Sequence, residues 1–200
     1  MIIAEKNILF LNMANMTNAK KAKILKMFDV DEDLQENFDK IEPTLKPLLT
    51  ERELNILKRY EYNFNKVLDE YERAGIKIVS IYSEDYPELL KQIQEPPLCL
   101  YCKGDVSLLK CPSIAIVGSR KCSEYGQVTT ASFTRELSQA GLVIVSGLAL
   151  GVDAIAHKTA LDNNGKTIAV LGGGFNHVYP QANYGLYQQI CHFGLVVSEY

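Results

Sequence analysis

The chain has 200 residues, of which 47% are hydrophobic and 22% charged, so it can form one medium domain or two small ones with buried cores. No apolar run approaches the roughly 18 residues that span a bilayer, which excludes a membrane-spanning helix. The first residues include Glu5 and Lys6 and contain no small-residue cleavage site, so we expect a cytoplasmic protein without a membrane partner.

The first 75 residues show apolar side chains at helical spacing. One short amphipathic stretch covers 22–28. Thr50–Glu53 has a capping-box pattern and opens a longer helix that Gly75 stops. We therefore predict a small all-helical N-terminal domain over residues 1–75, of the SAM or helix-hairpin kind.

The most basic stretch lies in this domain and contains Lys20, Lys21, Lys23 and Lys26. Such runs usually form a solvated helix face, and we favour that interpretation. The alternative is an auxiliary contact with DNA.

From residue 76 the pattern alternates between strands and helices. The predicted strands are 76–81, 98–102, 113–117, 142–145, 167–171 and 195–197. The predicted helices are 86–93, 124–139, 152–162 and 184–191. Continuous apolar strands that alternate with helices indicate the α/β class, with an open, doubly wound parallel sheet.

The five cysteines predict neither a disulfide framework nor a zinc site. Cys99 and Cys102 lie three residues apart on a predicted strand, so their side chains point to opposite faces. There is no second Cys-x-x-Cys pair in the sequence. We expect buried thiols, no metal and no cofactor.

Three strand ends of the predicted sheet are rich in glycine and small polar residues: Gly118–Arg120, Ser146–Gly151 and Gly172–Gly174. Ligands of such sheets bind beyond the carboxyl ends of the strands, where glycine exposes backbone N–H groups and helix N-termini attract anions. Arg120 adds donors that match phosphate oxygens, and Lys121 adds charge beside it. The pattern predicts an anion-binding edge.

Two familiar phosphate motifs are missing at this edge. The first loop is not Gly-x-Gly-x-x-Gly, and the chain has no Gly-x-x-x-x-Gly-Lys-Ser/Thr of a P-loop, which disfavours dinucleotide binding and ATP hydrolysis. Residues 113–200 carry five basic and five acidic side chains. Any binding of nucleic acid must therefore depend on a local cluster of basic groups.

Two further groups have alternative interpretations. Asp153 and His157 share one helix face and form either an acid–base pair or, as we favour, a carboxylate at the helix N-terminus beside a packed histidine. The segment Tyr179–Asn183 is either a turn with a helix start, or a site where Tyr179 stacks and Asn183 donates hydrogen bonds.

Taken together, the motifs resemble the DNA-processing protein A (DprA/Smf) family over about residues 80–200. The matching segments are Tyr86–Leu90, Pro96–Gly104, Ile116–Arg120 with Tyr125-Gly126, Ser146–His157, Gly172–Gly174 before Tyr179-Pro180 and Asn183, and Ser198–Tyr200.

The resemblance implies a protein without enzymatic activity that binds single-stranded DNA and loads the recombinase RecA during natural transformation. It implies an extended Rossmann-like domain over residues 76–200, incomplete at its C-terminus because the family continues beyond Tyr200, and a homodimer of the full-length protein. By motif, Gly118, Ser119 and Arg120 are expected to hold a DNA phosphate, with Ser146, Gly147 and Asn183 lining the same pocket. Lys121 is our addition, from its charge and proximity. The alternatives are an enzyme related to the nucleotide phosphoribohydrolases and a nucleotide sensor.

Overall fold

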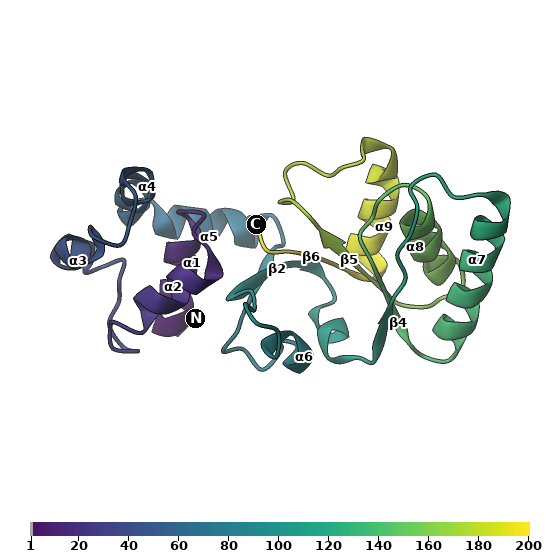
Figure 1. Ribbon diagram of the computed structural model, residues 1–200, viewed down its shortest axis with the longest axis horizontal. Helices are drawn as coiled ribbons and strands as arrows, with labels where there is room; N and C mark the ends of the chain where they lie inside the picture. The colour runs from purple at the N-terminus through teal and green to yellow at the C-terminus, as the bar shows by residue number, and fades with distance from the viewer. Residues whose placement is uncertain (1) are drawn as a thin grey trace. The chain divides into compact units, whose positions relative to one another are not determined.

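The computed structural model describes residues 2–200, and its N-terminal part is helical (Figure 1). The helices are α1 (Ile3–Asn12), α2 (Asn18–Leu25), α3 (Phe38–Leu45), α4 (Glu51–Glu61) and α5 (Phe64–Arg73). Their core is aromatic: the ring of Phe10 meets Phe38 and Phe64 edge-on, with centroids 5.5 and 5.9 Å apart. All three rings are buried, and such pairs add about 0.5–1.5 kcal/mol beyond their area burial.

The long helix predicted from Thr50 to Gly75 is two helices in the structure. The Thr50–Glu53 capping box forms as expected and starts α4. The break comes at Asn63, whose side-chain amide donates to the Arg59 carbonyl at 3.0 Å and so replaces a helical hydrogen bond. After the break, α5 begins with the buried Phe64.

The basic run on α2 is partly engaged within this helical part. Lys20 forms an ion pair with Glu53 at 2.5 Å, and the ammonium group of Lys21 donates to the side chain of Asn12. Lys23 and Lys26 are exposed. The solvated helix face predicted for this run is therefore found at Lys23 and Lys26, whereas Lys20 and Lys21 make contacts within the helical part.

A six-stranded sheet occupies the rest of the chain, in the order β1-β2-β6-β5-β4-β3. The strands are β1 (Lys77–Ser80), β2 (Cys99–Gly104), β3 (Ser113–Ala115), β4 (Val143–Ser146), β5 (Thr167–Leu171) and β6 (Leu195–Ser198). The helices around them are α6 (Glu88–Lys91), α7 (Glu124–Gln139), α8 (Val152–Asp162) and α9 (Tyr184–Phe193), with short 3-10 turns at Val106–Lys110 and Gln181–Asn183.

The four strands from β3 to β6 are parallel, as predicted, and β2 runs antiparallel to β6. The sheet is therefore mixed, with the antiparallel strand beside an otherwise parallel set, which is common in this fold class. The Rossmann-like α/β class is confirmed.

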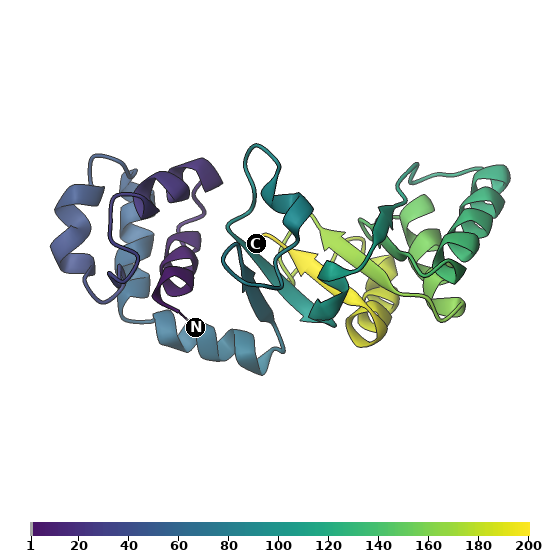
Figure 2. The same ribbon diagram turned by 90° about the horizontal axis from the view of Figure 1, so that it is seen from below.

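The three long helices of this domain lie on one face of the sheet, whereas the doubly wound sheet predicted from the sequence has helices on both faces. The strand order advances in one direction from β3 to β6, and right-handed crossovers then place α7, α8 and α9 on the same side. They contact each other in sequence order, and Figure 1 shows them standing next to one another. Figure 2 shows the strands of the same sheet from below.

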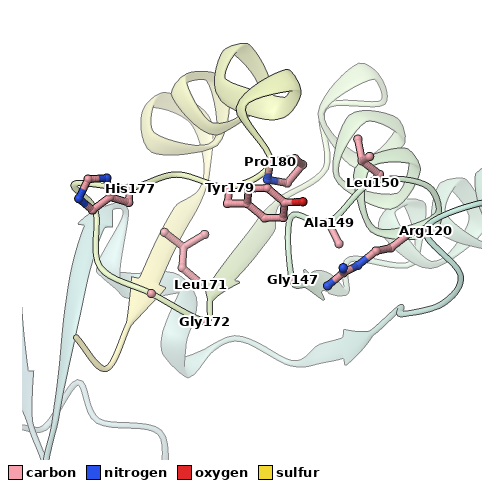
Figure 3. Close-up of a pocket in the computed structure, with 10 residues that line it drawn as sticks. Arg120, Gly147, Ala149, Leu150, Leu171, Gly172, His177, Tyr179 and Pro180 are labelled. Carbon is pink, nitrogen blue, oxygen red and sulfur yellow. The ribbon is translucent and has the colours of Figure 1, made fainter.

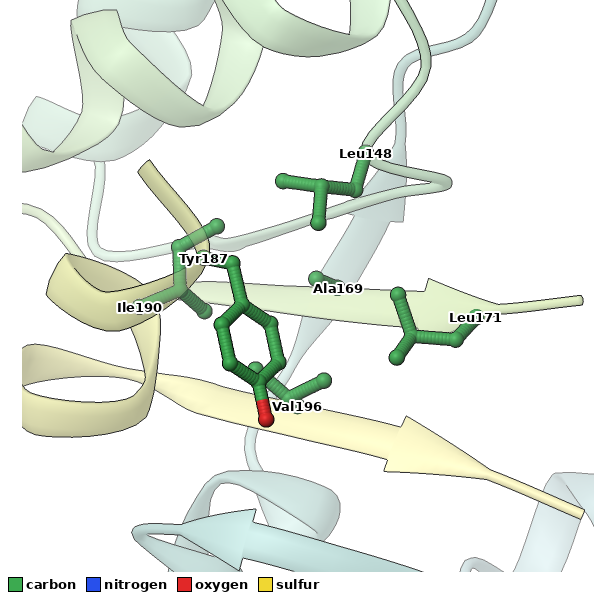
Figure 4. Packing of buried hydrophobic residues seen from close by; sticks show 6 residues of the cluster. All are labelled: Leu148, Ala169, Leu171, Tyr187, Ile190 and Val196. Atoms are coloured by element: carbon green, nitrogen blue, oxygen red, sulfur yellow. The ribbon is translucent and has the colours of Figure 1, made fainter. Parts of the chain in front are cut away.

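A compact apolar core lies between the sheet and α9 (Figure 4). Its members come from β5, β6, α9 and the loop that follows β4: Leu148, Ala169, Leu171, Tyr187, Ile190 and Val196. A second cluster joins Ile144 of β4 to Ala156 and Ala160 of α8. Each fully buried Leu, Ile or Val contributes about 1.5–3 kcal/mol, so these clusters hold the strand ends in place.

The chain divides into two compact units. The first comprises residues 1–74 and 79–99, and the second comprises 75–78 and 100–200. Segment 79–99, which the strand–helix pattern groups with the second domain, packs with the helices: the Ser80 hydroxyl donates to Glu5 at 2.8 Å, and the Asn12 amide donates to the Cys99 sulfur at 2.8 Å.

Within residues 2–200, no helix combines the length and the apolar character needed to cross a membrane.

Candidate functional site

A hollow of about 350 Å³ lies at the carboxyl ends of β4 and β5, in the second unit (Figure 3). It is lined by Arg120, Gly147, Ala149, Leu150, Leu171, Gly172, Gly173, His177, Tyr179 and Pro180. Three loops contribute these residues, and they are the three that follow β3, β4 and β5. The sheet edge predicted from the glycine-rich loops is therefore a real concave surface.

The loop after β3 brings Arg120 to this hollow. In Figure 3 the guanidinium of Arg120 points toward Gly147. The loop is tied to the start of α8, because the Val152 N–H donates to the Ser119 carbonyl at 3.2 Å. The Ser119 hydroxyl forms a local turn with Lys121, accepting from its N–H at 3.1 Å and donating to its carbonyl at 3.0 Å.

Gly151 allows the first two loops to touch. Its φ is +77°, and a Cβ there would lie 2.2 Å from the Ser119 carbonyl oxygen and 2.7 Å from that of Arg120. Gly118 is also a packing glycine, since a Cβ would come within 2.9 Å of Val152. From the sequence these glycines were expected to serve ligand approach, and the structure shows that close contact between loops also requires them.

The loop after β4 is held from two sides. The Asp153 carboxylate accepts the N–H groups of Gly147 at 3.1 Å and Ala149 at 3.4 Å. The Asn183 amide donates to the carbonyls of Leu148 at 2.9 Å and Ala149 at 3.1 Å. Both side chains are almost fully buried, so these hydrogen bonds are shielded from water.

Leu148 shows why such support is needed. Its φ is +60°, a left-handed conformation that costs a non-glycine residue about 1–2 kcal/mol. The side chain of Leu148 is fully buried in the core beneath the sheet edge, and this burial stabilises the fold by about 1.5–3 kcal/mol. Burial and the two Asn183 hydrogen bonds together outweigh the backbone strain and hold the loop in one shape.

His157 is buried behind this loop and has no access to the hollow. Its Nδ1 lies 2.7 Å from the Thr167 hydroxyl, which itself donates to the Ile144 carbonyl. The hydroxyl hydrogen is thereby used, so Nδ1 carries the proton and donates to Thr167. Burial lowers the pKa of His157 to about 4, an effect that the charge of Asp153 and the backbone of Ser146 partly oppose.

These contacts confirm the structural interpretation of the pair on α8. Asp153 satisfies backbone N–H groups beside the helix N-terminus, and His157 is a packed, neutral side chain. Neither residue lines the hollow.

The ionisable groups that line the hollow, among residues 2–200, are Arg120, His177 and Tyr179, and no carboxylate is among them. Gly172 and Gly173, in the loop after β5, are exposed. A Cβ at either position would meet nothing within 4 Å, so this part of the hollow is open. A concave surface lined by a guanidinium and exposed glycines, with no negative side chain in its lining, suits an anion such as a phosphate group.

The sequence of residues 77–200 matches the family described as DNA recombination-mediator protein A. The chain belongs to this family. The resemblance drawn from the loop motifs is thereby confirmed.

Curated relatives from two bacteria are DNA processing proteins. DprA of Bacillus subtilis is 38% identical over 147 residues, which are 73% of this chain and 50% of that protein. DprA of Streptococcus pneumoniae is 47% identical over 121 residues, which are 60% of this chain and 43% of that protein. The chain thus spans about half the length of these relatives.

Two solved structures of the family share the fold. The match to the X-ray structure of DprA from Streptococcus pneumoniae covers the whole of this chain and 69% of that one, with a TM-score of 0.77 and 35% identity. The match to DNA processing protein A from Helicobacter pylori, a structure described as showing a single-stranded DNA binding mode, covers 62% of this chain and 55% of that one, with a TM-score of 0.56 and 38% identity.

The residues predicted from the family motifs fall into two groups in the structure. Arg120 and Gly147 line the hollow, and Gly118, Ser119 and Lys121 are exposed on the loop that carries Arg120. Ser146 and Asn183 are buried, and their polar groups bond to backbone carbonyls: the Ser146 hydroxyl donates to Ile116 at 2.6 Å.

One residue of the hollow lacked a motif in the sequence. His177 lines it, yet nothing in its local pattern distinguishes it from an ordinary loop residue. The available signal was position alone, because His177 comes just after the glycine-rich end of β5. Leu150 and Pro180 lie in segments that the motifs included, but no role was predicted for them. Tyr179 was considered as a stacking residue, and it does lie at the hollow.

Proposed function

We propose that this chain binds single-stranded DNA through phosphate contacts at the hollow. The observation that carries the proposal is the Arg120 guanidinium, which points into a concave site lined by backbone and free of carboxylates. Membership of the recombination-mediator family and the single-stranded DNA binding mode described for the Helicobacter pylori relative support DNA as the ligand.

The proposed phosphate contacts are Gly118, Ser119, Arg120 and Lys121, and Gly147 borders the same site without donating its N–H, which Asp153 accepts. All five lie on the two loops that meet at Gly151. Ser146 and Asn183 would belong to the same site by holding these loops in shape. Because the contacts are with the DNA backbone, affinity would depend little on base sequence and strongly on salt.

The substitution Arg120→Ala tests this proposal in a fluorescence anisotropy titration with oligo-dT. Loss of a charge-assisted hydrogen bond of about 1.5–3 kcal/mol predicts an affinity lower by roughly ten- to a hundredfold. The plot of log affinity against log salt should also become shallower by about 0.7.

Arg135 provides the matched control, because it is an exposed arginine on α7 outside the hollow. Arg135→Ala should leave the affinity for oligo-dT within about twofold. Equal affinity of wild type and Arg120→Ala would contradict the assignment of the hollow.

We further propose that the complete protein acts as a mediator that loads RecA onto single-stranded DNA in the cytoplasm, as a homodimer and without chemistry of its own. Membership of a recombination-mediator family supports the mediator role. The absence of chemistry is supported by the burial of Asp153 and His157, the acid–base pair that the sequence suggested for an enzyme, because neither residue lines the hollow. The rate at which RecA filaments form on oligo-dT, measured with and without the protein, tests the proposed loading. Analytical ultracentrifugation of the complete protein tests the proposed homodimer.

A further inference from the structure

Basic side chains gather at the end of the sheet opposite to the hollow. Lys166 immediately precedes β5, whose other end leads to Gly172 in the hollow. Lys103 lies on β2, which is antiparallel to β6 and ends beside its first residues. Lys77 and Phe193 belong to the same compact unit. We call the surface of Lys77, Lys103, Lys166 and Phe193 the amino edge, because the parallel strands begin at this end.

Direct contacts hold the segments of the amino edge together. The Asp105 N–H donates to the Gly194 carbonyl at 2.9 Å and so joins the end of β2 to the turn before β6. The ammonium group of Lys166 donates to the Phe193 carbonyl at 3.1 Å. An ammonium group has three donors, so this bond positions Lys166 while the same group can also donate to a ligand.

Asp105 is a carboxylate within this group, and its own turn engages it. It accepts the N–H of Ser107 at 3.1 Å and the hydroxyl of Ser107 at 2.6 Å. The bond from this hydroxyl, together with the nearby charges of Lys166 and Lys77, holds the pKa of Asp105 below its usual value. Asp105 therefore fixes a turn, and its single charge cannot offset all the lysines around it.

Basic side chains outnumber acidic ones at this end of the sheet. The ends of the elements that meet here carry four lysines and two aspartates: Lys77, Lys103, Lys110, Lys166, Asp105 and Asp162. Residues 113–200 as a whole carry equal numbers of basic and acidic side chains, so this excess is local. A local cluster of this kind is what the binding of nucleic acid requires in a chain without a basic net charge.

An exposed aromatic ring lies among these lysines. Phe193 ends α9, and its side chain is 56% exposed. Its ring meets the ring of His192 edge-on, with centroids 4.5 Å apart, and its carbonyl accepts the hydrogen bond from Lys166. Single exposed aromatic rings are common on protein surfaces. This one differs because a cation is attached to its own backbone, which places charge and apolar surface side by side.

We infer that the amino edge is a second contact for single-stranded DNA, in which the three lysines meet phosphates and Phe193 stacks on a base. The inference rests on the proposed binding of single-stranded DNA but uses a surface separate from the hollow. Positive charge follows the backbone of an unpaired strand, and an aromatic ring accepts any base. An acidic protein segment would use the lysines but would gain little from the ring.

The length of β5 separates the two contacts. Lys166 precedes this strand and Gly172 follows it, and its five residues span about 17 Å. A DNA strand bound at the hollow must cross this distance before it reaches the amino edge. A short oligomer therefore occupies one contact, whereas a longer one gains the second contact as an intramolecular step.

The test compares oligo-dT of about 4 and about 16 nucleotides by fluorescence anisotropy with the full chain. The double variant Lys103→Gln, Lys166→Gln should weaken binding of the long oligomer by roughly five- to fiftyfold and change binding of the short one by less than about twofold. Its salt slope on the long oligomer should become shallower by about 1.4, since two phosphate contacts are lost.

Phe193→Ala separates stacking from charge. It should weaken binding of the long oligomer by roughly five- to a hundredfold and keep the salt slope, because no phosphate contact is lost. Lys66→Gln is the matched control, since it removes an exposed lysine on α5 in the other compact unit and should leave both affinities within about twofold. Photocrosslinking of a long oligomer that contains bromodeoxyuridine, mapped by mass spectrometry, should mark Phe193 or its neighbours.

Three outcomes would overturn the second contact. If the double variant and Phe193→Ala bind the long oligomer as wild type does, the amino edge does not bind DNA. If they weaken both lengths equally, these residues act on the hollow through the sheet. If only the lysine variant has an effect, the surface accepts a general polyanion such as an acidic protein segment.

Failure of the proposed function gives a different result. Arg120→Ala would then bind both lengths as wild type does, which shows that the hollow is not a DNA site. In that case the lysine variant and Phe193→Ala would still weaken binding of the long oligomer if the amino edge holds DNA.

Discussion

Asn183 illustrates, at the scale of single residues, how a buried amide can shape a binding loop. Its two donated hydrogen bonds end on carbonyls of Leu148 and Ala149, and its side chain has no free donor directed at the hollow. Its contribution to DNA binding would therefore be indirect, through the conformation of the loop that contains the left-handed Leu148.

We predict that Asn183→Ala lowers the free energy of unfolding by about 1–3 kcal/mol, since two buried carbonyls lose their donor. Urea unfolding followed by circular dichroism measures this change. Asn176→Ala, at an exposed position of the preceding loop, should stay within about 0.5 kcal/mol of wild type. A normal stability of Asn183→Ala with reduced affinity would instead indicate direct contact with DNA.

His157 predicts a dependence of stability on pH. Its pKa is about 4 in the folded chain and near 6.5 when unfolded, so only the unfolded state gains a proton between these values. Stability from this group is complete above pH 6.5 and is lost as the pH falls toward 4, by up to about 1.4 kcal/mol per pH unit.

Urea unfolding at pH 7, 6 and 5 checks this slope by comparing wild type with His157→Gln. The variant loses the titrating group, so its stability should fall less steeply with acid than that of wild type. Parallel curves for the two proteins would show that His157 does not titrate in this way.

At the scale of elements, the start of α8 joins the two loops that form the cationic side of the hollow. Val152 binds the Ser119 carbonyl, and Gly151 allows the contact without a side chain. The N-terminus of the helix is thereby used to hold the neighbouring loop. Its free N–H groups contribute less to anion binding than the glycine-rich pattern suggested, because Asp153 places a carboxylate beside them.

Gly151→Ala should disturb this junction, because the added Cβ meets backbone oxygens and the positive φ disfavours alanine. We expect a loss of about 1–3 kcal/mol in unfolding free energy and weaker binding of oligo-dT as the Arg120 loop shifts. Gly185→Ala is the matched control: it lies on α9 in open space and should be neutral or stabilise by roughly 0.4–1 kcal/mol. Wild-type stability of Gly151→Ala would mean that the loops are not in contact.

At the scale of the whole molecule, the parallel order from β3 to β6 brings three sequence-distant loops to one edge of the sheet. Right-handed crossovers place α7, α8 and α9 on one face, so the strand ends remain open to a ligand. The fold therefore positions the proposed DNA site by topology, and the buried clusters behind the loops keep its shape.

Local patterns in the sequence were sufficient for most of the elements of this domain. The helices at 124–139 and 152–162 and the strand at 167–171 have the predicted bounds, because their apolar period and their end signals agree. The break at Asn63 was missed, since a side chain that replaces a helical hydrogen bond leaves no sign in the apolar period. The antiparallel pairing of β2 with β6 was also missed, because strand direction depends on distant partners.

The sequence by itself determined the class of fold, the glycine-rich sheet edge and the place of Arg120 on it. Only the tertiary structure decided which polar side chains remain free there. Ser146 and Asn183 satisfy carbonyls 30 and 35 residues away in the chain, and buried polar groups must find such partners. Those partners meet only when the sheet forms. A motif therefore identifies residues of the proposed site, but it does not distinguish the residues exposed at the hollow from the buried residues that hold the loops in shape.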